Sequence, residues 1–370
     1  MLRHSKALLS KRMLILSEAE VRQCFPVAAA IECNRKALSS LLENGDGGAM
    51  VPSRIGLPYN PGDACSSTDW SLFKPAAYYP PNNTKKETEN NIIMGMKAVS
   101  VRANNPSIGK PTAPATIMLL NPATGEVSSI MGATYLTAAR TAAGSALATE
   151  LALSNVQSKD LTLVIFGAGL QAELHIKSIQ HVLRVKNVVI INRTLERAEK
   201  LKQDLQSESE AQCDSITTIT LSDHQGVREA IQNADIIVAA TNTCEPLFDG
   251  KLLKPGCHVN GVGSFTPHMK ELDDTLVQRC EVIIDTPEAL EVGDLSWLKA
   301  NINRVPNNTG LIGDALMGHF EFGKLRNDSA IPQIDCTFFK SCGTAIQDVV
   351  SAQYVYDLAS RKDIGYNMEM

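Results

Sequence analysis

The feature that most constrains the fold is a glycine-containing turn between an apolar run and a helix-forming segment. Leu161–Phe166 has the length of a buried strand, and the turn Gly167-Ala168-Gly169-Leu170-Gln171-Ala172 follows it directly. In this context the first glycine permits a tight turn, the second lets the backbone approach a pyrophosphate, and the alanine keeps the helix close to the strand. The free N–H groups at the helix N-terminus favour phosphate. The segment therefore predicts a dinucleotide-binding turn, with residues 167–171 as cofactor contacts.

The end of the next apolar run, Val185–Ile191, indicates which dinucleotide binds. Enzymes that use NAD usually place a carboxylate there to accept a hydrogen bond from the ribose 2′-hydroxyl. This chain instead has Asn192, Arg193 and Thr194. A guanidinium can hold a 2′-phosphate bidentately, which favours NADPH over NADH. The alternative is that Arg193 is only a solvated turn residue.

Further apolar runs alternate with helical segments after residue 161, which predicts a parallel sheet in an α/β fold. The sequence predicts further strands and helices on either side of these runs. They are a strand near Met13, a helix over Ala19–Glu43 capped by Ser17 with Glu20, a hairpin of Thr116–Leu120 and Val127–Met131, a small-residue helix over Leu136–Leu153, and a last helix over Gly343–Ser360. We expect residues 1–12 to form a tail and Tyr79–Asn90 an exposed loop, although a weak targeting segment at the start stays possible.

Composition limits the class of protein. The 370 residues, 44% of them hydrophobic, are enough for two domains, and a net charge of −5 argues against nucleic-acid or anionic-membrane partners. The apolar runs are too short to span a bilayer. The nine cysteines lack zinc-ligand spacing, so we expect no metal site and reduced thiols in a cytoplasmic protein.

Several segments together resemble the ornithine cyclodeaminase and mu-crystallin family, over about Met13 to Ala359. They are Val51-Pro-Ser-Arg54, Gly95-Met-Lys97-Ala-Val-Ser, Leu136-Thr-Ala-Ala-Arg140-Thr-Ala-Ala, the glycine turn, Val262-Gly-Ser264-Phe-Thr-Pro-His-Met-Lys-Glu-Leu and Lys340-Ser-Cys-Gly-Thr-Ala-Ile-Gln-Asp348. The resemblance implies an α/β fold with a Rossmann domain over 146–335. It also implies a discontinuous α+β substrate-binding and dimerisation domain over 1–145, completed by 336–370. The active site would lie in the cleft between the domains, and the protein would be a homodimer.

The resemblance also implies roles for individual residues. Arg54, Lys97 and Arg140 would bind the carboxylate of an amino or imino acid, a task for which cationic side chains in a partly dry site are suited. The alternatives are surface positions for Arg54 and Lys97 and a structural ion pair for Arg140. Lys74 is a further nearby cation that either influences substrate choice or faces solvent. Additional cofactor contacts are expected at Thr141, Thr241, Val262, Gly263, Ser264 and Gly343.

One departure from the family pattern bears on the reaction. True ornithine cyclodeaminases have a catalytic aspartate where this chain has Ser264, and a glutamate where it has Leu72. Serine is not a base near neutral pH without an activating partner. The chain therefore resembles the ketimine reductase, alanine dehydrogenase and imine reductase branches more closely.

We expect NADPH-dependent reduction of an imino acid such as a cyclic ketimine, with hydride passing from nicotinamide C4 to the imine carbon. Lys97 is the candidate proton donor or electrostatic anchor, and His175 and His268 are alternatives, although His175 fits a packed position better. Three other functions stay open: an amino-acid dehydrogenase, an ornithine cyclodeaminase, and a small-molecule binding protein like mu-crystallin.

Overall fold

The computed structural model describes residues 12–42, 48–59, 69–80, 91–154, 160–207, 213–304, 309–324 and 333–369. The expected tail before residue 12 and most of the expected loop over Tyr79–Asn90 lie outside these ranges. The chain divides into two compact units, one made of Met1–Pro26, Met50–Thr137 and Asp348–Met370, the other of Val27–Ala49 and Ala138–Gln347. The domain bounds expected from the sequence remain a prediction, because a unit defined by packing need not coincide with a ligand-binding domain.

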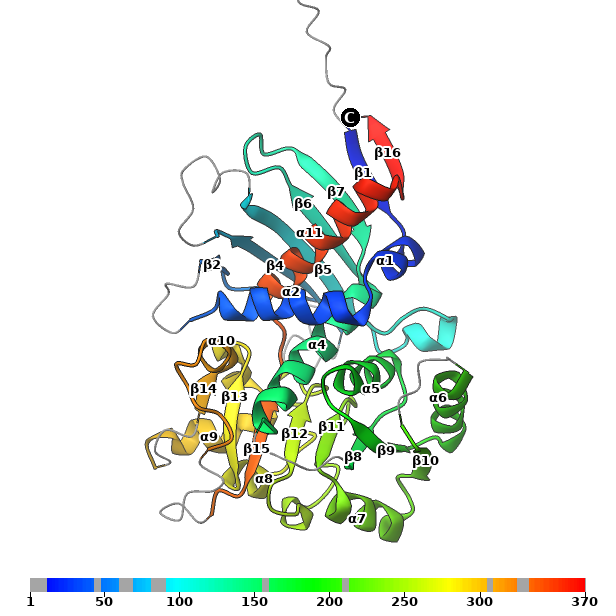
Figure 1. Ribbon diagram of the computed structural model, residues 1–370, viewed down its shortest axis with the longest axis vertical. Coiled ribbons are helices and arrows are strands. Elements are labelled where there is room, and N and C mark those ends of the chain that lie inside the picture. Colours follow the sequence, from blue (N-terminus) through cyan, green and yellow to red (C-terminus); the bar gives the residue numbers. More distant parts are fainter. Residues whose placement is uncertain are drawn as a thin grey trace, which may run out of the picture. The chain divides into compact units, whose positions relative to one another are not determined.

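The first unit is built on a mixed sheet with the strand order β16-β1-β7-β6-β5-β4-β2, and β3 pairs with β4 (Figure 1). Its strands are β1 (Arg12–Leu16), β2 (Ala49–Met50), β3 (Ile55–Pro58), β4 (Trp70–Tyr78), β5 (Ile93–Val101), β6 (Ala115–Leu120), β7 (Val127–Gly132) and β16 (Tyr366–Glu369). The expected hairpin is confirmed as the antiparallel pair β6–β7. The long helix α11 (Ala345–Lys362) lies along one face of the sheet, and its Val349 side chain lies 3.2 Å from the position that a Cβ on Gly95 of β5 would take.

The helix expected over Ala19–Glu43 is interrupted in the structure. α1 (Glu18–Cys24) starts at the predicted capping box, in which Ser17 and Glu20 bond each other's backbone N–H groups. The chain leaves helical geometry at Phe25 and resumes in α2 (Val27–Ser39) after Pro26. Proline has no N–H to donate and its ring restricts the residue before it, so the single predicted helix was wrong at this point.

The second unit contains an all-parallel sheet with the order β10-β9-β8-β11-β12-β15-β13-β14. Its strands are β8 (Leu161–Phe166), β9 (Val185–Asn192), β10 (Ser215–Thr220), β11 (Ile236–Ala239), β12 (His258–Gly261), β13 (Cys280–Ile284), β14 (Thr309–Leu311) and β15 (Cys336–Lys340). The helices are α4 (Thr134–Ala152), which begins in the first unit, α5 (Leu170–Val182), α6 (Leu195–Ser207), α7 (His224–Asn233), α8 (Asp274–Gln278), α9 (Ser296–Asn301) and α10 (Ile312–Leu316).

The strand order identifies the second unit as a Rossmann-type domain. β9 and β10 lie on one side of β8, while β11 and β12 lie on the other, so the order of connection reverses between β8 and β11 (Figure 1). In open parallel sheets, ligands bind beyond the carboxyl ends of the strands at such a reversal. The predicted α/β class is confirmed, and the glycine turn after β8 lies at that point.

No helix within the described ranges has both the length and the apolar character that crossing a bilayer would need.

Candidate cofactor and substrate sites

The glycine turn has the geometry of a phosphate-binding loop. Gly167 has φ of 114°, and a Cβ on it would lie 2.7 Å from the carbonyl oxygen of Ala240, so a side chain is excluded there. Gly169 is the exposed N-cap of α5 and provides no side-chain cap. Among the described atoms nothing lies within 4 Å of the position of a Cβ on Gly169. The N-terminus of α5 therefore has open space at Gly169, with Ala168, Leu170 and Gln171 in the same turn.

The loop after β9 keeps the predicted polar residues together. The Asn192 side-chain amide donates to the Thr194 carbonyl oxygen at 2.8 Å, which closes a short turn. Arg193, at the tip of that turn, is exposed, and within the described part of the chain it forms no ion pair. Its guanidinium is therefore available to an anionic ligand at the carboxyl end of β9, the strand next to β8.

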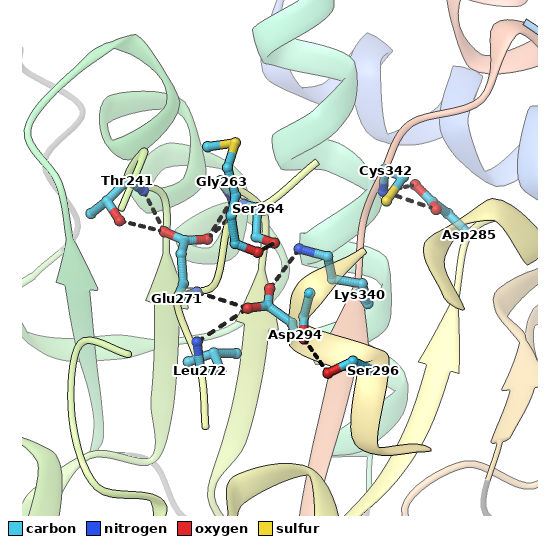
Figure 2. A network of polar contacts seen from close by, with 12 residues as sticks. Thr241, Gly263, Ser264, Glu271, Leu272, Asp285, Asp294, Ser296, Lys340 and Cys342 are labelled. Atoms are coloured by element: carbon cyan, nitrogen blue, oxygen red, sulfur yellow. Dashed lines mark hydrogen bonds and ion pairs between the residues drawn. The ribbon is translucent and has the colours of Figure 1, made fainter. Parts of the chain in front are cut away.

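The ends of β11 and β12 are joined by Glu271, which is not among the predicted site residues. One carboxylate oxygen accepts from the N–H and the hydroxyl of Thr241, at 2.6 and 2.7 Å. The other accepts from the N–H groups of Gly263 and Ser264, at 2.7 and 3.0 Å (Figure 2). A Cβ on Gly263 would overlap the Thr241 carbonyl oxygen. Glu271 thus fixes three of the predicted cofactor residues in one cluster, which requires glycine at position 263.

Ser264 is buried and its hydroxyl is occupied. The hydroxyl donates to the Met269 carbonyl oxygen at 2.7 Å, and the side chain is fully inaccessible to solvent. The neighbouring Val262 N–H bonds the Ala239 carbonyl oxygen at 2.9 Å, which extends the β11–β12 pairing beyond the strands. The position at which cyclodeaminases would have an aspartate therefore carries neither an acid nor a free hydroxyl.

A second buried carboxylate, Asp294, binds the backbone of Glu271. Asp294 accepts from the N–H groups of Glu271 and Leu272, at 2.7 and 3.2 Å, and pairs with the Lys340 ammonium at 2.8 Å (Figure 2). Burial raises the pKa of Glu271, although Lys340 and the Thr241 hydrogen bonds oppose the rise. Burial lowers the pKa of Lys340, but the charges of Asp294, Cys342 and Glu271 and the hydrogen bond to Asp294 together raise the pKa above its usual value.

Arg140 lies on α4 in a closely fitted environment. It is buried, and its guanidinium donates to the side-chain carbonyl of Gln347 at 3.1 Å. A Cβ on Gly343, whose φ is 72°, would overlap that guanidinium. The Gly343 N–H is bonded to the Asp285 carboxylate at 2.7 Å. Two predicted residues, Arg140 and Gly343, are therefore in contact, and Thr141 follows on the same helix in a buried position.

Lys97 on β5 is 1% exposed and pairs with an equally buried carboxylate, Asp348, at the start of α11. The ammonium lies 2.8 Å from Asp348 Oδ1 and donates to the Thr137 hydroxyl at 3.4 Å. Asp348 ends the last segment of the family resemblance, but its role was not predicted, since nothing in the local sequence connects residues 251 positions apart. The ion pair offsets part of the cost of burying the ammonium.

Lys74 on β4 is the direct register partner of Lys97 on β5 and is 5% exposed. Arg54 is half-buried and directly precedes β3, whose first residue, Ile55, pairs with Phe73 of β4. On the other side of Lys97 the register continues into apolar side chains, Ile117 on β6 and Met131 on β7.

The two histidines considered as proton donors differ in setting. His175 on α5 is fully buried, with its ring nitrogens at 2.7 Å from the Gln171 carbonyl oxygen and 3.0 Å from the Ser145 hydroxyl. Burial lowers the pKa of His175 to about 4, which the bond to Gln171 partly opposes. This setting agrees with the packed position favoured from the sequence. His268 is exposed.

Within the described residues, His, Cys, Asp and Glu side chains form no cluster suited to a metal ion. The cysteines in the same ranges are free thiols.

The fold and both sites define a two-unit protein with a Rossmann dinucleotide-binding unit, and comparison with known proteins gives the family. Residues 83–363 match the ornithine cyclodeaminase/mu-crystallin family. The chain belongs to this family.

Three similar proteins illustrate its relationships. Δ1-pyrroline-2-carboxylate reductase of Bacillus cereus (strain ATCC 10987) is 32% identical over 96% of this chain and 100% of its own length. Mouse ketimine reductase mu-crystallin is 33% identical over 68% of this chain and 72% of its own length. The structure of Thermococcus litoralis Δ1-pyrroline-2-carboxylate reductase with NADH and L-proline superposes with a TM-score of 0.78 at 24% identity, covering 96% of this chain and 100% of that one.

Proposed function

We propose that this chain reduces α-imino acids, such as cyclic ketimines, with NADPH as the preferred cofactor. The similar bacterial and mouse proteins are named as reductases of C=N substrates. The chain is an oxidoreductase that acts on C–N bonds with a nicotinamide cofactor. When bound, the reduced nicotinamide supplies a hydride to the C=N carbon. The nitrogen gains a proton, so the imine is reduced by two electrons to an amine.

The cofactor assignment rests on the second unit's own residues. The uncapped N-terminus of α5 at Gly169 would hold the pyrophosphate through backbone N–H groups. Arg193 and Thr194 would hold the ribose 2′-phosphate, because β9 ends in Asn192 without the carboxylate that would repel it. Thr241, Val262, Gly263 and Ser264 would line the nicotinamide end, with Thr141 and Gly343 as further contacts. The Thermococcus protein was crystallised with NADH, so the preference for NADPH depends on Arg193.

Substrate binding is proposed to depend on cations. Arg54, Lys97 and Arg140 would hold the substrate carboxylate, as the family resemblance implies. Lys97 is suited to this task because Asp348 keeps a charged ammonium in a buried place, at 2.8 Å. The same ammonium would either donate the proton to the nitrogen or only neutralise the carboxylate.

The observation that favours reduction over cyclodeamination is that the Ser264 hydroxyl is already hydrogen-bonded within the protein. Its hydroxyl is committed to the Met269 carbonyl oxygen, and the nearest carboxylate, Glu271, already accepts four hydrogen bonds. Neither group is free to take a proton from a substrate amine. We therefore propose that ornithine is not a substrate. A homodimer is proposed from the family resemblance.

Oxidation of NADPH, followed by its absorbance, tests the proposal. The substrates are Δ1-pyrroline-2-carboxylate, Δ1-piperideine-2-carboxylate, and keto acids with ammonia or methylamine, with NADH and L-ornithine as controls. We expect imine-dependent oxidation that is faster with NADPH, and no proline from ornithine. Lys97→Met should abolish turnover without weakening NADPH binding, whereas Lys110→Met, an exposed lysine, should change neither.

Proline formed from ornithine would overturn the assignment based on Ser264. NADPH binding without turnover of any imine would instead favour a binding protein. Faster turnover with NADH would remove only the role of Arg193.

A further inference from the structure

A fully buried amide on α2 begins a chain of hydrogen bonds that reaches Arg140. The Asn34 side chain has no exposed surface, and its Oδ1 accepts from Gln347 Nε2 at 2.6 Å. Gln347 is 1% exposed, and its Oε1 accepts from the Arg140 guanidinium at 3.1 Å. Resting on the proposed reduction of imino acids, we propose that Asn34 is a positioning residue. It acts through Gln347 to hold Arg140 in the orientation that binds the substrate carboxylate.

The orientation of both amides follows from the groups at the two ends of the chain. The Ala30 carbonyl oxygen can only accept, so Asn34 directs its Nδ2 there, at 2.8 Å, and presents Oδ1 to Gln347. At the other end, the Arg140 guanidinium and the Thr344 N–H can only donate, and both reach Gln347 Oε1, at 3.1 and 2.9 Å. One orientation of each amide is therefore compatible with all of these hydrogen bonds.

The packing of α2 does not by itself account for an amide at position 34. The buried face of this helix is otherwise mainly apolar, with Ala30, Ile31, Ala37 and Leu38. Asparagine is a weaker helix former than leucine, and a buried amide costs free energy unless it is hydrogen-bonded. A leucine would therefore serve the packing of α2 better. The value of Asn34 lies in the hydrogen bond that orients Gln347.

The surroundings of Arg140 restrict its guanidinium further. A Cβ on Gly144 would lie 3.2 Å from Gln347 Nε2 and 3.9 Å from Asn34 Oδ1, so the small residue leaves room for the two amides. Gly144 follows Arg140 by four positions, which places both on one face of α4. Contact with Gly343 and the bond to Gln347 together set the direction of the guanidinium. A cation oriented before the ligand arrives loses less freedom on binding.

Asn34→Leu tests the inference, because it keeps the size of the side chain and removes the acceptor for Gln347. The Gln347 Nε2 would then be buried without this acceptor, or the amide would turn and set a donor against the guanidinium of Arg140. The full-length enzyme is assayed with NADPH on the imine that the wild type reduces fastest. We expect KM for the imine to rise roughly 5- to 100-fold, with kcat within about threefold and the Kd of NADPH unchanged.

Matched variants separate positioning from a general loss of structure. Asn34→Asp keeps an acceptor for Gln347, so it should retain most of the affinity for the imine even where its thermal unfolding midpoint falls. Ser40→Ala removes a different buried hydrogen bond just after α2, from the hydroxyl to the Ala37 carbonyl oxygen at 2.6 Å, and should leave KM unchanged. Asn34→Ala, which also lacks the acceptor, replaces Asn34→Leu if that variant does not fold.

A double-mutant cycle tests whether Asn34 acts through Gln347. The variants are Asn34→Leu, Gln347→Leu and both together, and the measured quantity is KM for the imine. We expect the double variant to be no worse than Gln347→Leu alone, because the first link has no effect once the second is absent. Additive effects of the two substitutions would overturn the inference.

Other outcomes would overturn it as well. Unchanged KM in Asn34→Leu, or equal increases in Asn34→Leu and Asn34→Asp, would show that Asn34 contributes only to stability. So would a crystal structure of Asn34→Leu in which Gln347 and Arg140 keep their orientation. A wild-type enzyme that reduces no imine would overturn the proposed function instead, and the crystal structure would then still decide whether Asn34 positions Arg140.

Discussion

Replacing Asp348 with asparagine should destabilise the first unit by several kcal/mol. The change keeps the size of the side chain but removes the carboxylate that lies 2.8 Å from the Lys97 ammonium, where both side chains are 1% exposed or less. At an effective dielectric constant near 20, opposite charges at this distance attract by about 6 kcal/mol. Removing one partner of a buried pair costs about 3–5 kcal/mol in practice, because the other charge stays buried. We expect a loss in this range.

A double-mutant cycle measures the coupling free energy between Asp348 and Lys97. The variants are Asp348→Asn, Lys97→Met and both together, unfolded in urea in a Trp297→Phe background. This background leaves Trp70 on β4 as the fluorescent reporter, because the chain has two tryptophans. We expect a coupling free energy of at least about 2 kcal/mol. Asp357→Asn, an exposed position on the same helix, should change stability by less than about 0.5 kcal/mol.

A coupling free energy near zero would refute the reasoning. So would a stability of Asp348→Asn within about 1 kcal/mol of the wild type, since a buried ammonium without its carboxylate cannot be that inexpensive.

Three further predictions concern the second unit. Gly263→Ala should raise the Kd for NADPH at least about tenfold in a fluorescence titration, because its Cβ would overlap the Thr241 carbonyl oxygen; unchanged affinity would contradict this role. Arg193→Asp should reverse the preference between NADPH and NADH, measured as the ratio of the two kcat/KM values. His175 has a pKa of about 4 in the folded state. The free energy of unfolding should therefore decrease as pH falls from about 6.5 towards 4, since only the unfolded state then takes up the proton. The loss should be roughly 3 kcal/mol by urea unfolding and smaller in His175→Asn.

Sequence reasoning identified the elements whose signals are local. The turn after β8, the capping box at Ser17 and the β6–β7 hairpin all depend on residues close together in the chain, and all three are present. The helix expected over Ala19–Glu43 was wrong because its apolar pattern continues past Pro26, which breaks it. The order of the sheet strands could not be read from the sequence, since β15 joins β12 and β13 from far along the chain.

The candidate ligand-binding residues differ from the residues that position them in how far a sequence can indicate them. Lys97, Arg140 and the glycine turn belong to recognisable segments, and their roles stay predictions. Glu271 and Asp348 also lie within those segments, yet a carboxylate in a sequence gives no sign of which distant donors it will meet. Their importance depends on contacts with residues elsewhere in the chain, which only the fold brings together.

The discontinuous first unit has a consequence for how the chain is made. A ribosome releases the whole of the second unit before it reaches Asp348 and the last strand, β16, which pairs with β1. The nascent chain therefore carries Lys97 without Asp348, and the edge of β1 without β16, until synthesis is nearly complete. The parallel β1–β7 pair and the β6–β7 hairpin can form early, but the sheet is completed only after translation of residues 366–369. An exposed edge of this kind invites pairing between chains until β16 covers it.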